Sequence, residues 1–517
     1  MRRAVSLMTL FLLAACGFTH AEERPLPTTT AFVLPQTTPV PTLDRVFHPV
    51  ATPPPTASPP PSTCPEAQSR TRHTVSAEID YLNRLVAVRQ TVDYPNRAGV
   101  GLSQMVLNVK SNAAPGIFTL DGLRVNGAEA AAQLNGQRLS IELKPPLKPG
   151  CSLTIELNFG LRLMPIDPAG RNAYRGYLGY SPRQMNLGHW LATVATRAGG
   201  EWITREDNSI GEQDVLDEAD WDVTLAVKNA PEGLRVAAPG VMQDNQPGHW
   251  RLTLERAREF SLSLSDAFQV SGQRTAGGVK VELYAFEDAR IQTQMGVLDS
   301  AAFALDTAVK SLEMYADLFG AYPYERLVVV QGDFPDGMEF SGIVFVGGEY
   351  FLRFNGPTSY LMIITAHEIS HQWWYNKVAN DQALDPWLDE ALATYCEYIF
   401  IEEFYPALKD WWWDFRVNRL SPEGFVDSTV YEFPSRRAYI NAVYLRGTRM
   451  LHDLRADLGT DAFFDWLRRY VEVGSGRVMT PERFWALLTP EQLAATQATR
   501  DRYLRQPQIV VIAPEDF

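Results

Sequence analysis

Residues 364–376, ITAHEISHQWWYN, place two histidines four residues apart around a glutamate within an apolar run. On a helix, side chains at this spacing lie on one face about one turn apart, so His367 and His371 would point the same way. A zinc ion takes about four ligands in a tetrahedron, and this pair can supply two of them. Glu368 would lie at the edge of the same face, where its carboxylate can act as general base on metal-activated water. The alternative is a pair of satisfied core histidines, so a metal site requires a third ligand.

The next predicted helix, ALDPWLDEALATYCEYIF, supplies a candidate third ligand. Asp385 is a favourable N-cap, and Pro386 fits the first helical position. Glu390 then falls in the first turn, with eighteen residues between His371 and itself. Glu397 lies seven residues further on the same face, where it can brace a ligand as a hydrogen-bond acceptor. A solvated or capping glutamate is the alternative for that position.

This arrangement, HExxH followed by eighteen residues and a glutamate, resembles the gluzincin zinc metallopeptidases of the aminopeptidase N family. The stretches HEISHQWWYNKVAND and DPWLDEALATY are similar to the family's two metal helices, although Ala391 stands where the family usually has glycine. Downstream, AVYLRGTRMLHDL resembles the family's Tyr-x-Lys-Gly helix, with Arg446 in place of the lysine. The resemblance covers roughly residues 70 to 455 and is strongest at the metal helices.

The resemblance implies a role for each matched residue. One Zn²⁺ per chain would be bound by His367, His371 and Glu390. Glu368 would take a proton from the attacking water and pass it to the leaving amine. Tyr444 would donate a hydrogen bond to the developing oxyanion. The expected reaction is therefore the hydrolysis of a peptide bond by metal-activated water.

A second stretch, DGMEFSGIVF, resembles the family's substrate-binding strand, whose core is usually Gly-Ala-Met-Glu-Asn. Gly337, Met338 and Glu339 are retained, while Phe340 replaces the asparagine. In the family this glutamate holds the free α-amine of the substrate, which implies an aminopeptidase that removes N-terminal residues from peptides. If Glu339 is a plain structural carboxylate, the alternative is a zinc endopeptidase or oligopeptidase. A surface lipoprotein that keeps the fold as a non-catalytic scaffold is the third candidate.

The first residues of the chain predict export. Residues 1–15, MRRAVSLMTLFLLAA, combine two arginines with an apolar stretch too short to span a bilayer comfortably, as in a signal peptide. The sequence LAAC resembles a bacterial lipobox, which implies acylation of Cys16 and anchoring of the exported lipoprotein to the cell membrane or envelope. An ordinary signal peptide is the alternative. Residues 16–66 are then a linker, because 13 of the 41 residues from 25 to 65 are proline, which favours extended chain over a packed core.

Beyond the linker, the pattern predicts a multidomain α+β chain. Residues 67–274 alternate apolar and polar residues between Gly, Pro and Asn breaks, which predicts a β-rich domain that begins with a hairpin turning near Asn83. Residues 275–517 are mostly helical in pattern, with a long helix predicted over 289–318 and a strand in ERLVVVQ. The resemblance implies a saddle-like β domain and a thermolysin-like zinc peptidase domain. A more open cleft is expected, since the chain ends without the family's large C-terminal helical domain.

Charge and cysteine content narrow the choice of partners and ligands. The formal net charge of −14 and the lack of a Lys/Arg-rich run argue against nucleic acid as a partner. No CxxC pair is present, so thiolates are not expected to form the zinc site. Cys64 and Cys151 are candidates for a disulfide in an exported protein. Cys396 lies in an apolar helical stretch and is expected to be a buried thiol, and the oligomeric state is left open.

Overall fold

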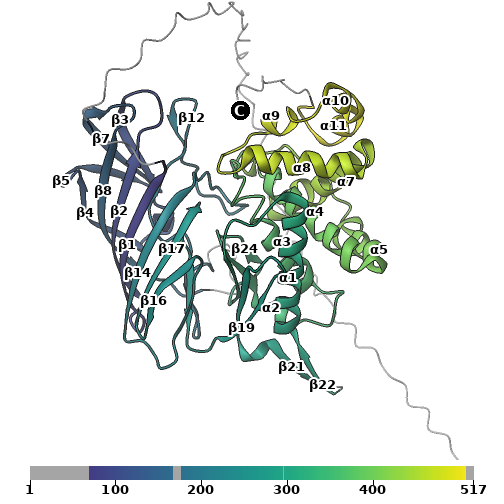
Figure 1. Cartoon of the computed structure of the whole chain (residues 1–517), viewed down its shortest axis with the longest axis horizontal. Helices are drawn as coiled ribbons and strands as arrows, with labels where there is room; N and C mark the ends of the chain where they lie inside the picture. The colour runs from purple at the N-terminus through teal and green to yellow at the C-terminus, as the bar shows by residue number, and fades with distance from the viewer. Residues whose placement is uncertain (1–63, 65–68, 167–175, 295, 508–517) are drawn as a thin grey trace, which may run out of the picture. The chain divides into compact units, whose positions relative to one another are not determined.

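The computed structural model describes residues 64, 69–166, 176–294 and 296–507. The predicted signal peptide, the lipidation site Cys16 and the predicted linker up to residue 63 lie outside these described residues. The described residues belong to one compact unit. Within them, no helix is long and apolar enough to cross a membrane. A β-rich region is followed by a mostly helical one, which confirms the predicted α+β class (Figure 1).

An eight-stranded sheet dominates the β-rich region (Figure 1). In β1 (Thr71–Asp80), the first strand along the chain, buried and exposed residues alternate strictly: Val75, Ala77 and Ile79 are buried, and the residues between them are exposed. One face of the sheet therefore packs on the core and the other meets solvent. The first two strands form the predicted hairpin, in which Asp80 lies opposite Leu85. In order across the sheet, the strands are β16 (Val241–Gln246), β17 (His249–Ala257), β14 (Ala219–Lys228), β1 (Thr71–Asp80), β2 (Leu85–Pro95), β8 (Ser152–Arg162), β4 (Phe118–Val125) and β5 (Ala128–Glu129).

Three smaller sheets complete the β-rich region. The eight-stranded sheet and the smaller sheets share one hydrophobic core, in which Trp190, Trp221 and Phe159 are buried. Cys64 and Cys151 form the predicted disulfide, with Cα atoms 5.5 Å apart, so the end of the linker is tied to the start of β8. The strands, sheet by sheet, are β15 (Arg235–Ala237), β18 (Leu262–Ser265), β10 (Met185–Leu187) and β9 (Leu178–Tyr180); β11 (Thr193–Val194), β3 (Leu102–Asn108), β7 (Arg138–Leu147) and β6 (Ala132–Asn135); and β12 (Arg197–Ala198) with β13 (Glu201–Trp202).

A five-stranded sheet leads into the helical region. The strand predicted in ERLVVVQ is present, and its nearly continuous run of buried residues is typical of a parallel strand. The predicted boundary between residues 274 and 275 falls within a hairpin of this sheet, in which Arg274 pairs with Lys280. The division into domains 67–274 and 275–517 stays a prediction. In order, the strands are β19 (Gln269–Arg274), β20 (Lys280–Ala285), β23 (Arg326–Gly332), β25 (Ile343–Gly347) and β24 (Gly337–Met338).

The long helix predicted over residues 289–318 is wrong in its first third. A β-hairpin occupies that part, and it projects at the lower edge of the view in Figure 1. Gly296 has a φ of 127°, which a helix cannot continue. Asp299 then caps the true helix by accepting a backbone hydrogen bond of 2.8 Å in the first turn. The elements are β21 (Arg290–Thr293), β22 (Gly296–Asp299) and α1 (Ser300–Phe319).

Two further helices correspond to the predicted metal helices, namely α3 (Tyr360–Ser370) and α4 (Trp387–Phe404). Pro386 has helical dihedral angles at the start of α4, as expected of a first helical position. No side-chain hydrogen bond caps this end, so Asp385 does not act as the predicted N-cap. The remaining helices are α2 (Gly348–Leu352), α5 (Lys409–Trp412), α6 (Arg436–Tyr439), α7 (Gly447–Leu458), α8 (Thr460–Gly474), α9 (Pro481–Trp485), α10 (Pro490–Ala495) and α11 (Gln497–Tyr503).

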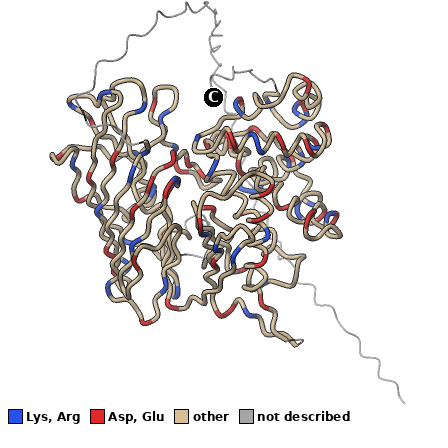
Figure 2. Tube along the Cα trace, in the orientation of Figure 1, with Lys and Arg blue, Asp and Glu red and all other residues tan. Residues whose placement is uncertain are grey.

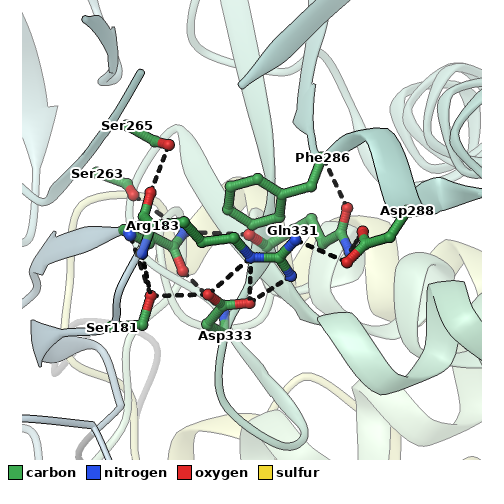
Figure 3. Close-up of polar contacts among 9 residues, drawn as sticks. Ser181, Arg183, Ser263, Ser265, Phe286, Asp288, Gln331 and Asp333 are labelled. Carbon is green, nitrogen blue, oxygen red and sulfur yellow. Dashed lines mark hydrogen bonds and ion pairs between the residues drawn. The ribbon is translucent and has the colours of Figure 1, made fainter. Parts of the chain in front are cut away.

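A polar network joins the β-rich region to the five-stranded sheet (Figure 3). Arg183 donates to both carboxylate oxygens of Asp333 at 2.7 to 3.1 Å and to Asp288 at 2.6 Å. Its guanidinium also lies 3.7 Å from the ring centroid of Phe286. Asp333 begins the loop between β23 and β24. The network therefore helps to position the segment that carries Glu339.

Candidate active site

His367 of α3 and His371, which caps the end of α3, are buried, and their ring nitrogens converge. Their Nε2 atoms are 3.1 Å apart. The Nδ1 atom of His367 lies 3.0 Å from a carboxylate oxygen of Glu397, and that of His371 lies 3.0 Å from the carbonyl oxygen of Trp374. Both partners can only accept, so each Nδ1 donates and each Nε2 faces the common centre. This arrangement suits a pair of metal ligands.

Glu390, in the first turn of α4, completes a group of three ligand atoms. Its Oε2 atom is 3.3 Å from Nε2 of His367 and 3.7 Å from Nε2 of His371. Tetrahedral coordination with bonds of about 2.1 Å separates ligand atoms by about 3.4 Å, and the three spacings bracket that value. The same Oε2 atom is buried without a hydrogen-bond partner among the described residues. A bound cation would relieve this unfavourable state, so the donor set fits zinc.

The surroundings of the two histidines shift their pKa values in opposite directions. Burial lowers the pKa of His371 to about 4, which favours the neutral form that binds metals. Burial would lower the pKa of His367 as well, but the neighbouring carboxylates of Glu390 and Glu397 outweigh it and raise the pKa to about 10. Metal binding would therefore displace a proton from His367.

Glu397 lies behind His367, on the side of its Nδ1 atom. Its side chain is fully buried and accepts two hydrogen bonds of 2.9 Å from Arg416. The buried carboxylate needs this partner, because its charge would otherwise be unpaired. This environment fits the bracing role and does not fit the solvated alternative. Arg416 was missed by the sequence analysis, since it lies in an irregular helical segment, residues 413–417, where no pattern marks an inward-facing guanidinium.

Glu368 lies against the backbone of β24. A Cβ atom at Gly337 would be 2.0 Å from the Oε1 atom of Glu368, so the retained glycine makes room for the glutamate. The Oε2 atom of Glu368 is buried without a hydrogen-bond partner in the described part of the chain. Potential ligand atoms of Glu368, Glu339 and His371 lie within 4.8 Å of one another. Burial raises the pKa of Glu368 to about 8, near the range in which a general base is effective at neutral pH.

Glu339 directly follows β24, in which Met338 is buried. Its carboxylate lies close to that of Glu212, from the β-rich region. Carboxylate oxygens of Glu339, Glu212 and Glu390 lie within 4.8 Å of one another. Nε2 of Gln382 donates a hydrogen bond of 3.1 Å to Glu339. Burial, followed by the charges of Glu212 and other nearby carboxylates, raises the pKa of Glu339 well above its usual value. A cation bound nearby would favour the charged form of these crowded carboxylates.

Glu212 and Gln382 were also missed by the sequence analysis. Glu212 lies outside the strands of the β-rich region, and Gln382 lies in the loop between α3 and α4. Neither has a regular spacing from the metal ligands along the chain. The only available signal was the polar stretch GEQD, residues 211–214, which resembles many exposed loops.

Tyr444 lies beside the ligand group, in an irregular helical segment at residues 440–446. Its ring is parallel to that of His367, with centroids 6.0 Å apart. Burial would raise the pKa of Glu390, but interactions with His367, His371 and the Tyr444 hydroxyl lower it below its usual value. Arg446, which replaces the family's lysine, donates to the carbonyl oxygen of Arg502 at 2.9 Å. The structure thus brings the Tyr444 hydroxyl to the ligand group.

Phe340 directs its ring into the β-rich region. The ring is fully buried and makes edge contacts with His189 and Tyr177, at centroid distances of 5.0 and 5.7 Å. A Cβ atom at Gly188 would lie 2.5 Å from the ring, so the ring occupies the space of a missing side chain. The ring is therefore an apolar contact between the two regions, while Glu339 stays beside the metal ligands.

Known proteins resemble this chain in sequence. Residues 303–502 match the profile of the Peptidase family M1 domain. Aminopeptidase M1-D from Oryza sativa subsp. japonica is 30% identical over 216 residues, and endoplasmic reticulum aminopeptidase 1 from Homo sapiens is 29% identical over 281 residues. The matches cover 38% and 50% of this chain and 25% and 28% of the relatives. The chain thus spans about a quarter of the length of the curated relatives it matches.

The fold is similar to that of a solved structure, a mutant of the M1 zinc metallopeptidase from Deinococcus radiodurans bound to the substrate Tyr-Ser-Ala. The TM-score is 0.58 at 19% sequence identity, and the similarity covers 87% of this chain and 98% of that chain. The common fold therefore includes both the β-rich and the helical region. Residues 303–502 thus resemble the Peptidase family M1 domain, and this part of the chain is similar in sequence to known aminopeptidases.

Proposed function

We propose that the chain is a zinc-dependent aminopeptidase that removes N-terminal residues from peptides. The observation that carries this proposal is the group formed by Glu339, Glu212 and Glu390, whose carboxylate oxygens lie within 4.8 Å of one another. Two carboxylates next to a ligand carboxylate form a receptor for a protonated amine. A peptide held there by its α-ammonium would present its first peptide bond to Glu368. Cleavage would then be restricted to the N-terminal residue.

The proposed zinc site uses His367, His371 and Glu390, with one ion per chain. A bound zinc ion would supply Lewis acidity toward water and toward the scissile carbonyl. Glu368, whose Oε2 atom has no hydrogen-bond partner among the described residues, would accept a proton from water and return it to the leaving amine. Tyr444 would donate its hydroxyl proton as a hydrogen bond to the oxyanion. Each side chain thereby has one defined task.

A comparison of blocked and free substrates tests the proposal. The zinc-loaded chain should hydrolyse an aminoacyl chromogenic amide and should leave its N-acetylated form intact, because acetylation removes the charge that Glu339 and Glu212 would bind. Equal cleavage of both substrates would instead support the endopeptidase or oligopeptidase alternative. Cleavage of neither would support the non-catalytic scaffold.

Metal content tests the proposed cofactor separately. We expect about one zinc ion per chain by elemental analysis, because one group of three ligand atoms fits a tetrahedral site. A chelator should abolish hydrolysis, and added zinc should restore it. The variant His371→Ala should lose both the metal and the activity, and retention of stoichiometric zinc by this variant would contradict the ligand assignment.

We also propose that the chain is exported and held at the cell envelope through acylation of Cys16. The signal-like residues 1–15 and the sequence LAAC support this proposal. The Cys64–Cys151 disulfide also supports export, because disulfides persist in oxidising compartments. Metabolic labelling with a fatty-acid probe should mark the wild-type chain and not the Cys16→Ala variant. Equal labelling of both would contradict the anchor.

A further inference from the structure

A cavity of about 680 Å³ lies outside the candidate active site and shares none of its residues. The starts of β1 and β14, the end of β2 and the loop after α8 meet around it. Its volume is within the range of small-molecule sites. Five arginines line it: Arg70, Arg97, Arg197, Arg258 and Arg477.

Positive charge exceeds negative charge in this arginine cavity. Only two of its lining residues are carboxylates, Asp217 and Glu218. Glu218 is already 3.4 Å from Arg256, and Arg70 is paired with Asp220 at 3.0 Å. Elsewhere the balance is the reverse, since the chain carries a formal charge of −14 and its Asp and Glu residues are spread along the described trace (Figure 2). The cavity is therefore a local concentration of positive charge in an acidic protein.

Arg258 is the buried member of the arginine cavity. It is 1% exposed, and its guanidinium donates to carbonyl oxygens, among them those of Leu216, Asn376 and Lys377 at 2.9 to 3.0 Å. The charges of Glu218 and Asp217 act on it from a distance, but no ion pair joins Arg258 to a carboxylate of the described residues. Its hydrogen bonds are satisfied, but its buried charge has no counter-ion in direct contact. A buried cation of this kind gains stability when an anion approaches.

Three other arginines of the cavity have guanidinium N–H groups that can donate hydrogen bonds to a ligand. The Nε atom of Arg197 is buried and has no hydrogen-bond partner in the described part of the chain. The side chains of Arg97 and Arg477 are exposed at the rim, and neither forms a hydrogen bond or an ion pair with a described residue. Guanidinium groups match the planar oxygen pairs of carboxylates and phosphates.

We propose that the arginine cavity binds a small anion that carries carboxylate or phosphate groups. Arg97 and Arg477 would engage the anion at the rim, Arg197 would donate from the wall, and Arg258 would supply charge from the interior. The volume admits an organic anion with more than one such group. This site is independent of the proposed peptidase activity, because neither its residues nor its ligand chemistry are shared with the metal centre.

Anion binding should also stabilise the chain segment that follows the metal helix. Arg258 donates to the carbonyl oxygens of Asn376 and Lys377, and the N–H of Gly476 donates to Lys377 at 2.8 Å. An anion bound by both Arg258 and Arg477 would therefore connect Arg258 to the loop after α8. Both already form hydrogen bonds with Lys377. A ligand that binds the folded chain and not the unfolded chain raises the melting temperature.

Calorimetric titration of the full chain with inorganic phosphate and with citrate, at ionic strength held constant with sodium chloride, tests the proposal. We expect saturable binding of at least one probe and a rise in melting temperature. The double variant Arg97→Gln/Arg477→Gln should weaken the affinity about tenfold or more, because it removes two charge-assisted donors. A matched control, Arg89→Gln/Arg124→Gln, removes the same charge from exposed strand positions outside the cavity and should bind like the wild type.

The opposite change provides a second test that does not depend on the double variant. Asp217→Asn removes a carboxylate from the cavity wall and should strengthen binding several-fold. Absence of saturable binding of both probes would overturn the proposal. Equal weakening by the control variant, or an equal effect of sodium chloride alone, would show that the signal comes from general charge screening. Either result would also overturn the proposal. If the double variant does not fold, an unchanged affinity in Asp217→Asn decides against the site.

Discussion

At the scale of single residues, the candidate site is defined by buried oxygen atoms without partners. The Oε2 atoms of Glu368 and Glu390 have no hydrogen bond within the described residues. Each such atom costs roughly 1–3 kcal/mol, and more when it is charged. A bound ligand would offset this cost. Together with the spacing of the ligand atoms, the two atoms fit positions for an attacking water and a metal ion.

The variant Glu368→Gln should abolish turnover and leave zinc bound. Glutamine preserves the size of the side chain but cannot accept the proton of the attacking water. We expect kcat to fall by at least about a hundredfold, in line with the usual contribution of a positioned general base. Hydrolysis rates and elemental analysis on the same sample check both parts. Substantial turnover in the zinc-loaded variant would exclude Glu368 as the base.

The variant Tyr444→Phe should lower kcat on the order of a hundredfold, because loss of one oxyanion donor costs about 3 kcal/mol. The ring can keep its stacking on His367, so the fold and the metal content should be unchanged. The affinity for the substrate should change little if the hydrogen bond forms mainly in the transition state. A rise in KM with an unaltered kcat would assign Tyr444 to substrate binding instead.

At the scale of secondary-structure elements, the approach of α4 to α7 depends on one glycine. A Cβ atom at Gly447 would lie 2.5 Å from the Cβ atom of Ala391. The alanine at 391, where the family usually has glycine, is thus accommodated because residue 447 has no side chain. Close packing of this kind leaves little room for extra atoms.

A double-mutant cycle tests this contact. Gly447→Ala should lower the free energy of unfolding by about 1–3 kcal/mol through overpacking. Ala391→Gly alone should cost about 1 kcal/mol through helix propensity. The double variant should be more stable than the sum of the two changes, because the colliding methyl group is gone. Urea denaturation of the four proteins measures the coupling, and strictly additive effects would refute the contact.

Arg416 links another element, the segment after α5, to the metal helices. Arg416→Gln should leave the fully buried Glu397 without its cation and so loosen its hold on His367. We expect the zinc affinity to fall by about 10–100-fold, the usual effect of losing an outer partner of a ligand. Competition with a chelator measures this affinity. Arg419→Gln, a change at an exposed arginine nearby in sequence, is the control and should leave the affinity unchanged.

At the scale of the whole molecule, a buried histidine of the β-rich region should make stability depend on pH. His73 stacks on Trp221 at 4.0 Å, and burial lowers its pKa to about 3 from the ordinary 6.5. The unfolded chain takes up a proton as the pH falls through 6.5, whereas the folded chain does not. Stability should therefore fall between about pH 6.5 and 3, by up to about 1.4 kcal/mol per pH unit, and this group should have no effect above that window.

The comparison of wild type with His73→Phe isolates this effect. Phenylalanine can keep the stacking on Trp221 but does not titrate, so its stability should fall less between pH 7.5 and pH 5 than that of the wild type. Denaturant midpoints at both pH values measure the difference. Parallel losses in the two proteins would show that His73 is not responsible.

The sequence by itself determined the α+β class, the metal helices and the candidate ligands His367, His371 and Glu390. These features depend on spacing within an element, where helical periodicity converts separation along the chain into direction. The hairpin at residues 290–299 was predicted as helix, because its short apolar runs fit both helical and strand periodicity. The N-cap at Asp299 was also not recognised.

Only the tertiary structure decided which residues support the candidate site from outside its helices. Glu212, Gln382 and Arg416 come from loops and from an irregular segment, and packing brings them to the ligands. It also decided that the ring of Phe340 faces the β-rich region while Glu339 stays at the site. Such distances depend on how separate elements pack in three dimensions, and local spacing along the chain does not encode them.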